Sequence, residues 1–243
     1  MKLTVRDAAR LLSVSEKTIY RLIKDAAIPA YQINDQYRFN RAELLEWATS
    51  RKIQVSPEIF AEPEGGDSPL LSLSESLRAG GVYYRVSGTD KPSVLQAVVD
   101  TMKLPDEVDR NFLYQVLLAR EALGSTGIGD GIAIPHVRNP IVLHLTQPMV
   151  TLSFLERPID FGALDGQPVS ALFTLISPTV RAHLHLLSRL GFALRNEDFK
   201  NAVARQSSRE EIFDALTRSE KAMKPAAPPP LGPGSANPQN SSD

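Results

Sequence analysis

The sequence predicts two domains of different class: a small, mostly helical N-terminal domain, and a larger α/β domain in which helices flank a mixed sheet. The length of 243 residues suits two modest domains. Residues 54–71 are rich in Pro, Gly and acidic residues and poor in core-forming ones, which indicates a linker. Helical spacing dominates before this segment, whereas strand-like and helical segments alternate after it. We therefore predict domains at 1–53 and 72–221 and, from its Pro, Ala, Gly and Ser content, a disordered tail at 222–243.

The N-terminal domain begins with two short helices joined by a tight turn. Apolar residues recur at helical spacing over 5–12 and again over 18–24, and Ser15 is well placed to cap the second helix. Two alternating runs on either side of residues 34–35 predict a β-hairpin, and a third helix follows over 41–51. Two short helices with this connection form a helix-turn-helix unit, to which the hairpin adds a wing.

The charge of this domain indicates a nucleic-acid partner. Residues 1–53 hold ten Lys and Arg against six Asp and Glu, although the whole chain has a net charge of −1. The outer face of the second helix and the wing offer side chains that can reach bases and phosphates in DNA, namely Lys17, Thr18, Tyr20, Arg21, Lys24 and Arg38. An ordinary solvated basic face is the alternative. Because one such module reads only a few base pairs, we expect a homodimer or a cooperative array on DNA.

In the second domain, the segment from Arg120 to Arg138 combines side chains suited to phosphate chemistry. A loop punctuated by glycines leads into an apolar strand over 132–134, Pro135 ends the strand, and His136 follows at once. This position predicts a histidine at an exposed edge of the sheet. Neutral imidazole is a competent nucleophile, and Arg forms forked bonds with phosphate oxygens. From spacing alone, an ordinary solvated His–Arg pair is the better explanation of the segment.

This segment resembles the active-site region of the enzyme IIA domains of the bacterial phosphotransferase system, in the fructose, mannitol and nitrogen-regulatory branch. The matching pattern is R-E followed by S-T-G-I-G-x-G-I-A-I-P-H, which ends at His136. Further matches are P-I-D-F at 158–161 and D-G-x-P-V at 165–169.

The resemblance implies an enzyme IIA-like α/β fold and a phosphohistidine carrier. It implies that His136 accepts the phosphoryl group, that His183 in an H-L segment lies near it, and that Arg120 binds the phosphoryl oxygens. The implied donor is the phosphocarrier protein HPr or a nitrogen-branch equivalent.

Residues 3–53 resemble the excisionase-type, MerR-like winged helix-turn-helix. The matching runs are T-V-x-x-A-A-x-L-L-x-V-S-x-x-T-I-Y-R-L-I, I-P-A, Y-R-F and E-L-L-E-W. The resemblance implies DNA binding. The sequence departs from the family at Ala26, where Gly is usual.

Composition excludes several other classes of protein. No apolar run approaches the roughly 18 residues of a membrane span, and charged residues interrupt the N-terminus where a signal peptide would be apolar. We therefore expect a cytoplasmic protein with no membrane partner. The chain has no cysteine, and no His–carboxylate cluster or nucleotide-binding loop is evident, so we predict neither a metal nor a cofactor.

The combined prediction is a bacterial DNA-binding regulator whose enzyme IIA-like domain accepts a phosphoryl group on His136. The chain contains no permease domain, which favours regulation over sugar transport. The alternative is a module of the same fold that senses or binds a partner without transferring phosphoryl groups. A DNA-binding excisionase with an inert appendage fits less well, because several site residues match together.

Overall fold

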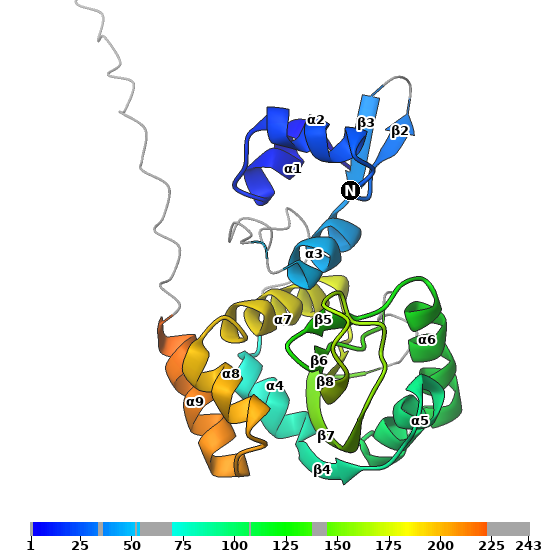
Figure 1. Ribbon diagram of the computed structural model, residues 1–243, viewed down its shortest axis with the longest axis vertical. Coiled ribbons are helices and arrows are strands. Elements are labelled where there is room, and N and C mark those ends of the chain that lie inside the picture. The colour runs from blue at the N-terminus through cyan, green and yellow to red at the C-terminus, as the bar shows by residue number, and fades with distance from the viewer. Residues whose placement is uncertain are drawn as a thin grey trace, which may run out of the picture.

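The structure, a computed structural model, describes residues 2–33, 36–51, 53, 70–106, 108–137 and 145–222. Figure 1 shows the small N-terminal domain standing on one side of the larger α/β domain, with its third helix between them. This arrangement brings an element of the first domain to the surface of the second.

The N-terminal domain is a helix-turn-helix unit with a small antiparallel sheet in the order β1-β3-β2. Thr4 and Asp7 form a capping box at the start of the first helix, and the Ser15 hydroxyl caps the second by accepting from the Thr18 N–H. The predicted helices and wing are confirmed, and a short N-terminal strand adds to them. The elements are β1 (Lys2–Leu3), α1 (Val5–Leu11), α2 (Glu16–Lys24), β2 (Tyr31–Ile33), β3 (Gln36–Asn40) and α3 (Arg41–Ser50).

The second domain is built on a mixed five-stranded sheet in the order β4-β7-β8-β6-β5. Strands β4 and β7 are parallel, β7 and β8 antiparallel, β8 and β6 parallel, and β6 and β5 antiparallel. The predicted fold class is confirmed. The elements are α4 (Leu73–Gly80), β4 (Val82–Val86), α5 (Lys91–Thr101), α6 (Arg110–Ala122), β5 (Gly127–Gly129), β6 (Ile132–Ala133), β7 (Met149–Ile159), β8 (Val169–Ile176), α7 (Val180–Ala193), α8 (Glu197–Ala204) and α9 (Arg209–Ala222).

Helices cover both faces of this sheet. In β8, Phe173 and Leu175 pack with residues of α4, α7, α8 and α9, whereas Leu172 and Ile176 pack with residues of α5 and α6. Alternate side chains of a strand point to opposite faces, so an apolar run such as β8 is explained by burial on both sides.

Helix α3 joins the two domains. Its residues 44–48 are all buried, and the core of the helix-turn-helix domain forms one continuous apolar cluster with the α7 side of the α/β domain. Figure 1 shows α3 lying against α7. The two helices approach closely, since a Cβ at Gly191 of α7 would lie 3.3 Å from Thr49 Cγ2 of α3.

Two predicted segments fall largely outside the described residues. Of the predicted linker 54–71, only residues 70 and 71 are described, and of the predicted tail 222–243, only residue 222. No helix within the described ranges is both long and apolar enough to cross a membrane.

Candidate functional site

His136 lies just beyond β6, beside β8 in the middle of the sheet. It forms a parallel bridge with Leu175, whose N–H donates to the Pro135 carbonyl at 2.9 Å. The imidazole Nδ1 lies 2.7 Å from the Ile134 carbonyl oxygen. A carbonyl only accepts, so Nδ1 carries the proton and the neutral ring keeps its lone pair on Nε2.

Arg120 approaches this lone pair from the last turn of α6. Its Nε–H donates to His136 Nε2 at 3.3 Å, and Nη1 donates to the Gly124 carbonyl at 2.9 Å. The structure thus brings together two residues that are sixteen positions apart in the sequence. Nε2 faces a fixed positive charge, which suits a site for an anion.

The neighbouring Glu121 holds the glycine loop in place. Its carboxylate accepts from the Thr126 N–H at 3.1 Å and from the Thr126 hydroxyl at 2.7 Å, and it pairs with Lys91 at 3.2 Å. Sequence reasoning missed this positioning role, although Glu121 belongs to the R-E pair that carried the resemblance. The loop conformation next to His136 therefore depends on a buried carboxylate.

His183 lies in the first turn of α7, with its ring centroid 5.2 Å from that of His136. It is only 1% exposed, and within the described part of the chain neither of its ring nitrogens has a hydrogen-bond partner. Burial, followed by electrostatic repulsion between the two imidazoles when both are protonated, lowers the pKa of His183 to about 3. The ring is therefore neutral near pH 7 and carries one N–H that it can donate.

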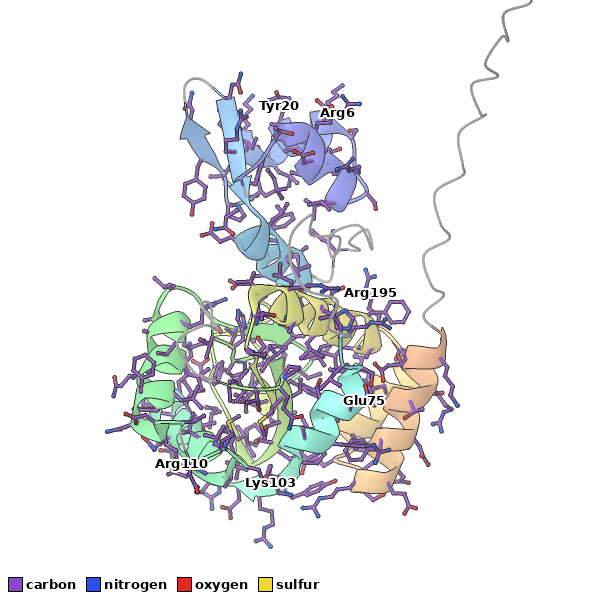
Figure 2. All side chains as sticks on the ribbon, turned by 180° about the vertical axis from the view of Figure 1, so that it is seen from behind. Arg6, Tyr20, Glu75, Lys103, Arg110 and Arg195 are labelled. Carbon is purple, nitrogen blue, oxygen red and sulfur yellow. The ribbon has the colours of Figure 1, made fainter. Side chains whose placement is uncertain are left out.

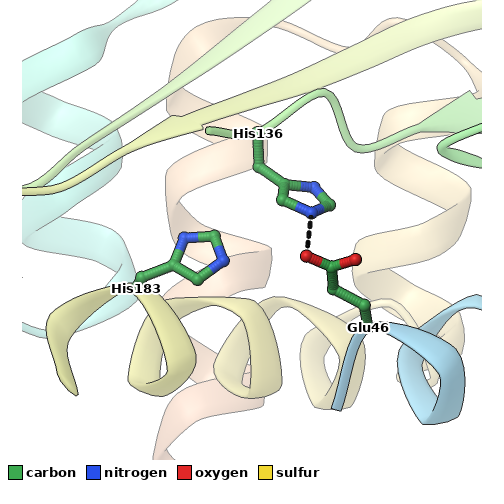
Figure 3. Close-up of side chains that lie close together, drawn as sticks. All are labelled: Glu46, His136 and His183. Atoms are coloured by element: carbon green, nitrogen blue, oxygen red, sulfur yellow. Dashed lines mark ion pairs between the residues drawn. The ribbon is translucent and has the colours of Figure 1, made fainter. Parts of the chain in front are cut away.

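A fourth group, Glu46 of α3, completes the cluster, and sequence reasoning did not find it. Its Oε1 lies 3.0 Å from His136 Nε2, and its Oε2 lies 3.0 Å from Arg120 Nη2. Figure 3 shows the carboxylate reaching His136 from the helix-turn-helix domain, with His183 alongside. His136 is 3% exposed in this arrangement, so the expectation of an exposed edge was wrong.

The contacts of His136 Nε2 cannot all be favourable at once. In the neutral ring, the lone pair accepts from Arg120 and faces the Glu46 carboxylate with no proton between them. In the protonated ring, Nε2–H donates to Glu46, and the Arg120 N–H then faces a nitrogen without a lone pair. The contact between Glu46 and His136 is therefore favourable only when Nε2 is protonated, and the bond from Arg120 only when Nε2 is not.

The donor set also corrects the prediction that no His–carboxylate cluster exists. One ligand atom from each of Glu46, His136 and His183 lies within 4.8 Å of the others, and two imidazoles with a carboxylate are a known zinc set. The three residues are far apart in the sequence, so no spacing motif reveals them. The Arg120 guanidinium already donates to the ligand atom of His136, which opposes a cation and favours an anion.

A cavity of about 280 Å³ lies next to the cluster, between α3 and the α/β domain. Glu43, Glu46 and Trp47 line it from α3, and Arg120 and His136 line it from the opposite side. The interface around the histidine is thus incompletely packed.

The candidate DNA-binding residues occupy a different part of the molecule. Lys17, Tyr20, Arg21 and Lys24 of α2 are exposed and lie on one face, because they are three or four positions apart. Figure 2 shows Tyr20 at the end of the small domain away from the α/β domain.

Two of the six predicted DNA-binding side chains are less accessible than expected. The half-buried Thr18 shares a hydrogen bond with the Ser15 hydroxyl at 2.9 Å, as part of the cap of α2. Arg38 is half-buried and donates to the Gln36 side chain and to the Tyr37 carbonyl at 3.1 Å.

Comparison with known proteins identifies both domains. Residues 75–219 match the family described as "Phosphoenolpyruvate-dependent sugar phosphotransferase system, EIIA 2", and residues 3–52 match a helix-turn-helix domain family.

The chain is 34% identical over 151 residues to a nitrogen regulatory protein of Pseudomonas aeruginosa, which covers 60% of this chain and 96% of that protein. It is 33% identical over 156 residues to a nitrogen regulatory protein of Escherichia coli, covering 62% and 92%. The crystal structure of the nitrogen regulatory protein IIA-Ntr from Neisseria meningitidis superposes with a TM-score of 0.50 and 27% identity, covering 60% of this chain and 96% of that one.

Proposed function

The chain belongs to the EIIA 2 family of the phosphoenolpyruvate-dependent sugar phosphotransferase system and carries an N-terminal helix-turn-helix domain, and we propose that it is a DNA-binding regulator whose EIIA domain accepts a phosphoryl group on His136. The donor is a histidine-phosphorylated carrier protein of the HPr class. Two of the relatives are called nitrogen regulatory proteins, and this name together with the attached helix-turn-helix domain favours regulation over sugar transport.

The observation that carries the proposal is the set of groups around His136 Nε2. The bond from Nδ1 to Ile134 leaves the Nε2 lone pair as the nucleophile. Arg120 is placed to bind phosphoryl oxygens, and the neutral His183 has an N–H available for the same purpose. A nucleophilic imidazole, a guanidinium and a neutral imidazole at one point suit the transfer of a phosphoryl group.

The transfer step follows from this geometry. The P–N bond of the donor phosphohistidine breaks, and its electron pair stays on the donor nitrogen. The Nε2 lone pair of His136 forms the new P–N bond, while the Nδ1 proton remains on the ring and bonded to the Ile134 carbonyl. Arg120 and His183 stabilise charge on the phosphoryl oxygens in a loose transition state.

The test is to incubate the full chain with phosphorylated HPr and to measure intact protein mass. We expect the addition of one acid-labile phosphoryl group to the wild-type protein and none to His136→Ala. His185→Ala, which changes another histidine of α7, is the matched control and should be modified like the wild type. Modification of His136→Ala at the wild-type level would contradict the proposal.

One observation favours a second candidate, a binding module of the same fold that transfers no phosphoryl group. His136 is buried and in contact with Glu46, as expected for a structural contact between domains. A protein that remains unmodified by phosphorylated HPr, even when Glu46 is replaced by Gln, would support this second function. Modification of either form supports the first.

A further inference from the structure

From the position of Glu46 we infer that the helix-turn-helix domain and the phosphoryl group compete for the same place. Docking of α3 on the EIIA domain and phosphorylation of His136 then exclude each other. This inference rests on the proposed phosphoryl acceptance at His136. It adds a regulatory contact between the two domains of the chain.

The Glu46 carboxylate uses the groups proposed to bind the phosphoryl group. Each oxygen of Glu46 lies 3.0 Å from one of them, Oε1 from His136 Nε2 and Oε2 from Arg120 Nη2. A carboxylate is a planar pair of anionic oxygens, and a transferring phosphoryl group becomes a near-planar set of anionic oxygens at its transition state. Both match the guanidinium fork. Glu46 therefore acts as an internal substitute for the phosphoryl oxygens.

The docked α3 also blocks access to His136 Nε2. Nucleophilic attack requires the donor phosphorus to approach along the Nε2 lone pair, roughly in line with the leaving nitrogen. Glu46 Oε1 occupies the approach to Nε2, and His136 is 3% exposed. In the docked state a phosphocarrier protein cannot bring its phosphohistidine to this nitrogen, so α3 must first move away.

Charge repulsion opposes docking once His136 is phosphorylated. A phosphoryl group on Nε2 would bring its negative oxygens against the Glu46 carboxylate, which is 9% exposed. Like charges at this distance in a poorly hydrated site repel strongly, and phosphorylation beside an acidic residue disrupts the contact. Once formed, the phosphohistidine therefore keeps the helix-turn-helix domain from docking again.

Helix α3 also has polar contacts within its own domain that would keep it there when it leaves the EIIA domain. The Trp47 indole N–H donates to the Ala27 carbonyl, and the Tyr31 hydroxyl of β2 donates to Glu43 of α3. A cavity of about 280 Å³ interrupts the contact of α3 with the EIIA domain. Twenty-two residues, 51–72, join α3 to α4, and a chain of this length can span up to about 70 Å.

The test measures the phosphorylation rate of the full chain with phosphoramidate, a small donor that needs no carrier recognition. Glu46→Gln removes the charge, and Gly191→Gln inserts a side chain where α7 meets Thr49 without touching the site. Glu43→Gln is the matched control, because Glu43 lies one turn away on α3 and bonds to Tyr31 at 2.6 Å. We expect the first two variants to react about tenfold faster or more, since release of the docked state raises the competent fraction, and Glu43→Gln to react like the wild type.

Small-angle X-ray scattering supplies the second readout. The unphosphorylated wild type should be compact with or without a chelator, and the phosphorylated wild type and Gly191→Gln should have a larger radius of gyration. Compactness that is lost on adding EDTA would mean that an ion bridges Glu46 and the histidines, and would overturn the inference.

The outcomes separate this inference from the function on which it rests. Equal reaction rates in the wild type, Glu46→Gln and Gly191→Gln would overturn the competition and leave phosphoryl acceptance standing. No reaction in any of them, with His136→Ala indistinguishable, would overturn the proposed function and the competition together.

Discussion

Among the single residues of the site, His183 differs from His136 in having no hydrogen-bond partner within the described part of the chain. Both ring nitrogens lack partners within the described residues, and the ring is almost fully buried. A buried polar group without a partner destabilises a fold, so its presence calls for a reason beyond packing. An N–H held ready for an anionic oxygen supplies that reason, since the bond would form only when the site is filled.

The pH dependence of stability should reveal this neutral ring. Burial lowers the pKa of His183 to about 3 from 6.5, so between these values the unfolded state binds a proton that the folded state does not. The stabilisation is complete above pH 6.5 and declines as the pH falls towards 3, by at most about 1.4 kcal/mol per unit. We expect the free energy of unfolding of His183→Gln, measured with urea from pH 7 to 4, to fall less steeply than that of the wild type.

The difference between the two curves isolates this histidine, because the carboxylates that also titrate in this range are shared by both proteins. Groups facing the ring are His136, Glu46 and Arg120, and these too are unchanged in the variant. Parallel curves would mean that His183 accepts its proton in the folded state.

The residues of the site differed in how well the sequence predicted them. His136 and Arg120 belong to one short segment, and their neighbours in that segment carry the resemblance. Glu46 could not be found in this way, because its role depends on how a helix of one domain meets the surface of another. Periodicity indicates which residues of α3 are buried, such as Leu44 and Leu45, but not which surface lies against a polar residue such as Glu46.

At the scale of secondary-structure elements, the turn after α2 combines a standard cap with an unusual residue. The Ala27 N–H donates to the Leu22 carbonyl at 2.9 Å and the Ala26 N–H to the Ile23 carbonyl at 3.0 Å, the two bonds of a Schellman motif. Ala26 has φ 50°, in the left-handed region where glycine is favoured. The sequence indicated this position through the missing glycine, and the backbone adopts the glycine-like geometry anyway.

Replacing Ala26 by Gly should therefore stabilise the helix-turn-helix domain. Relief of the left-handed strain gains about 1–2 kcal/mol, and the greater freedom of glycine in the unfolded chain offsets about 0.4–1 kcal/mol of this. We expect a net gain of about 0.5–1 kcal/mol in urea unfolding of the full chain. Ala27→Gly is the matched control: it adds the same freedom without relieving a positive φ, and should destabilise. A loss of stability in both variants would contradict the account.

At the scale of the whole molecule, the two proposed binding surfaces point in different directions. The exposed face of α2 lies at the end of the small domain away from the EIIA domain (Figure 2), whereas Glu46 of the same domain reaches into the histidine site (Figure 3). Docking thus leaves the basic face uncovered. Phosphorylation would then change where the EIIA domain sits relative to bound DNA, rather than uncover the DNA-binding helix.

The salt dependence of DNA binding tests whether the exposed basic face of α2 contacts DNA. Arg21 and Lys24 are exposed on α2, and each phosphate contact made by such a side chain contributes about 0.9 to the slope of log affinity against log salt concentration. Arg21→Ala and Lys24→Ala should each weaken binding to non-specific duplex DNA and make this slope shallower by about 1, measured by fluorescence anisotropy. Lys103→Ala, a matched loss of one positive charge at the opposite end of the molecule (Figure 2), should leave the slope unchanged. Equal slopes in all four proteins would place the DNA contacts elsewhere, while a shallower slope in Lys103→Ala would show that net charge, rather than the α2 face, drives the binding.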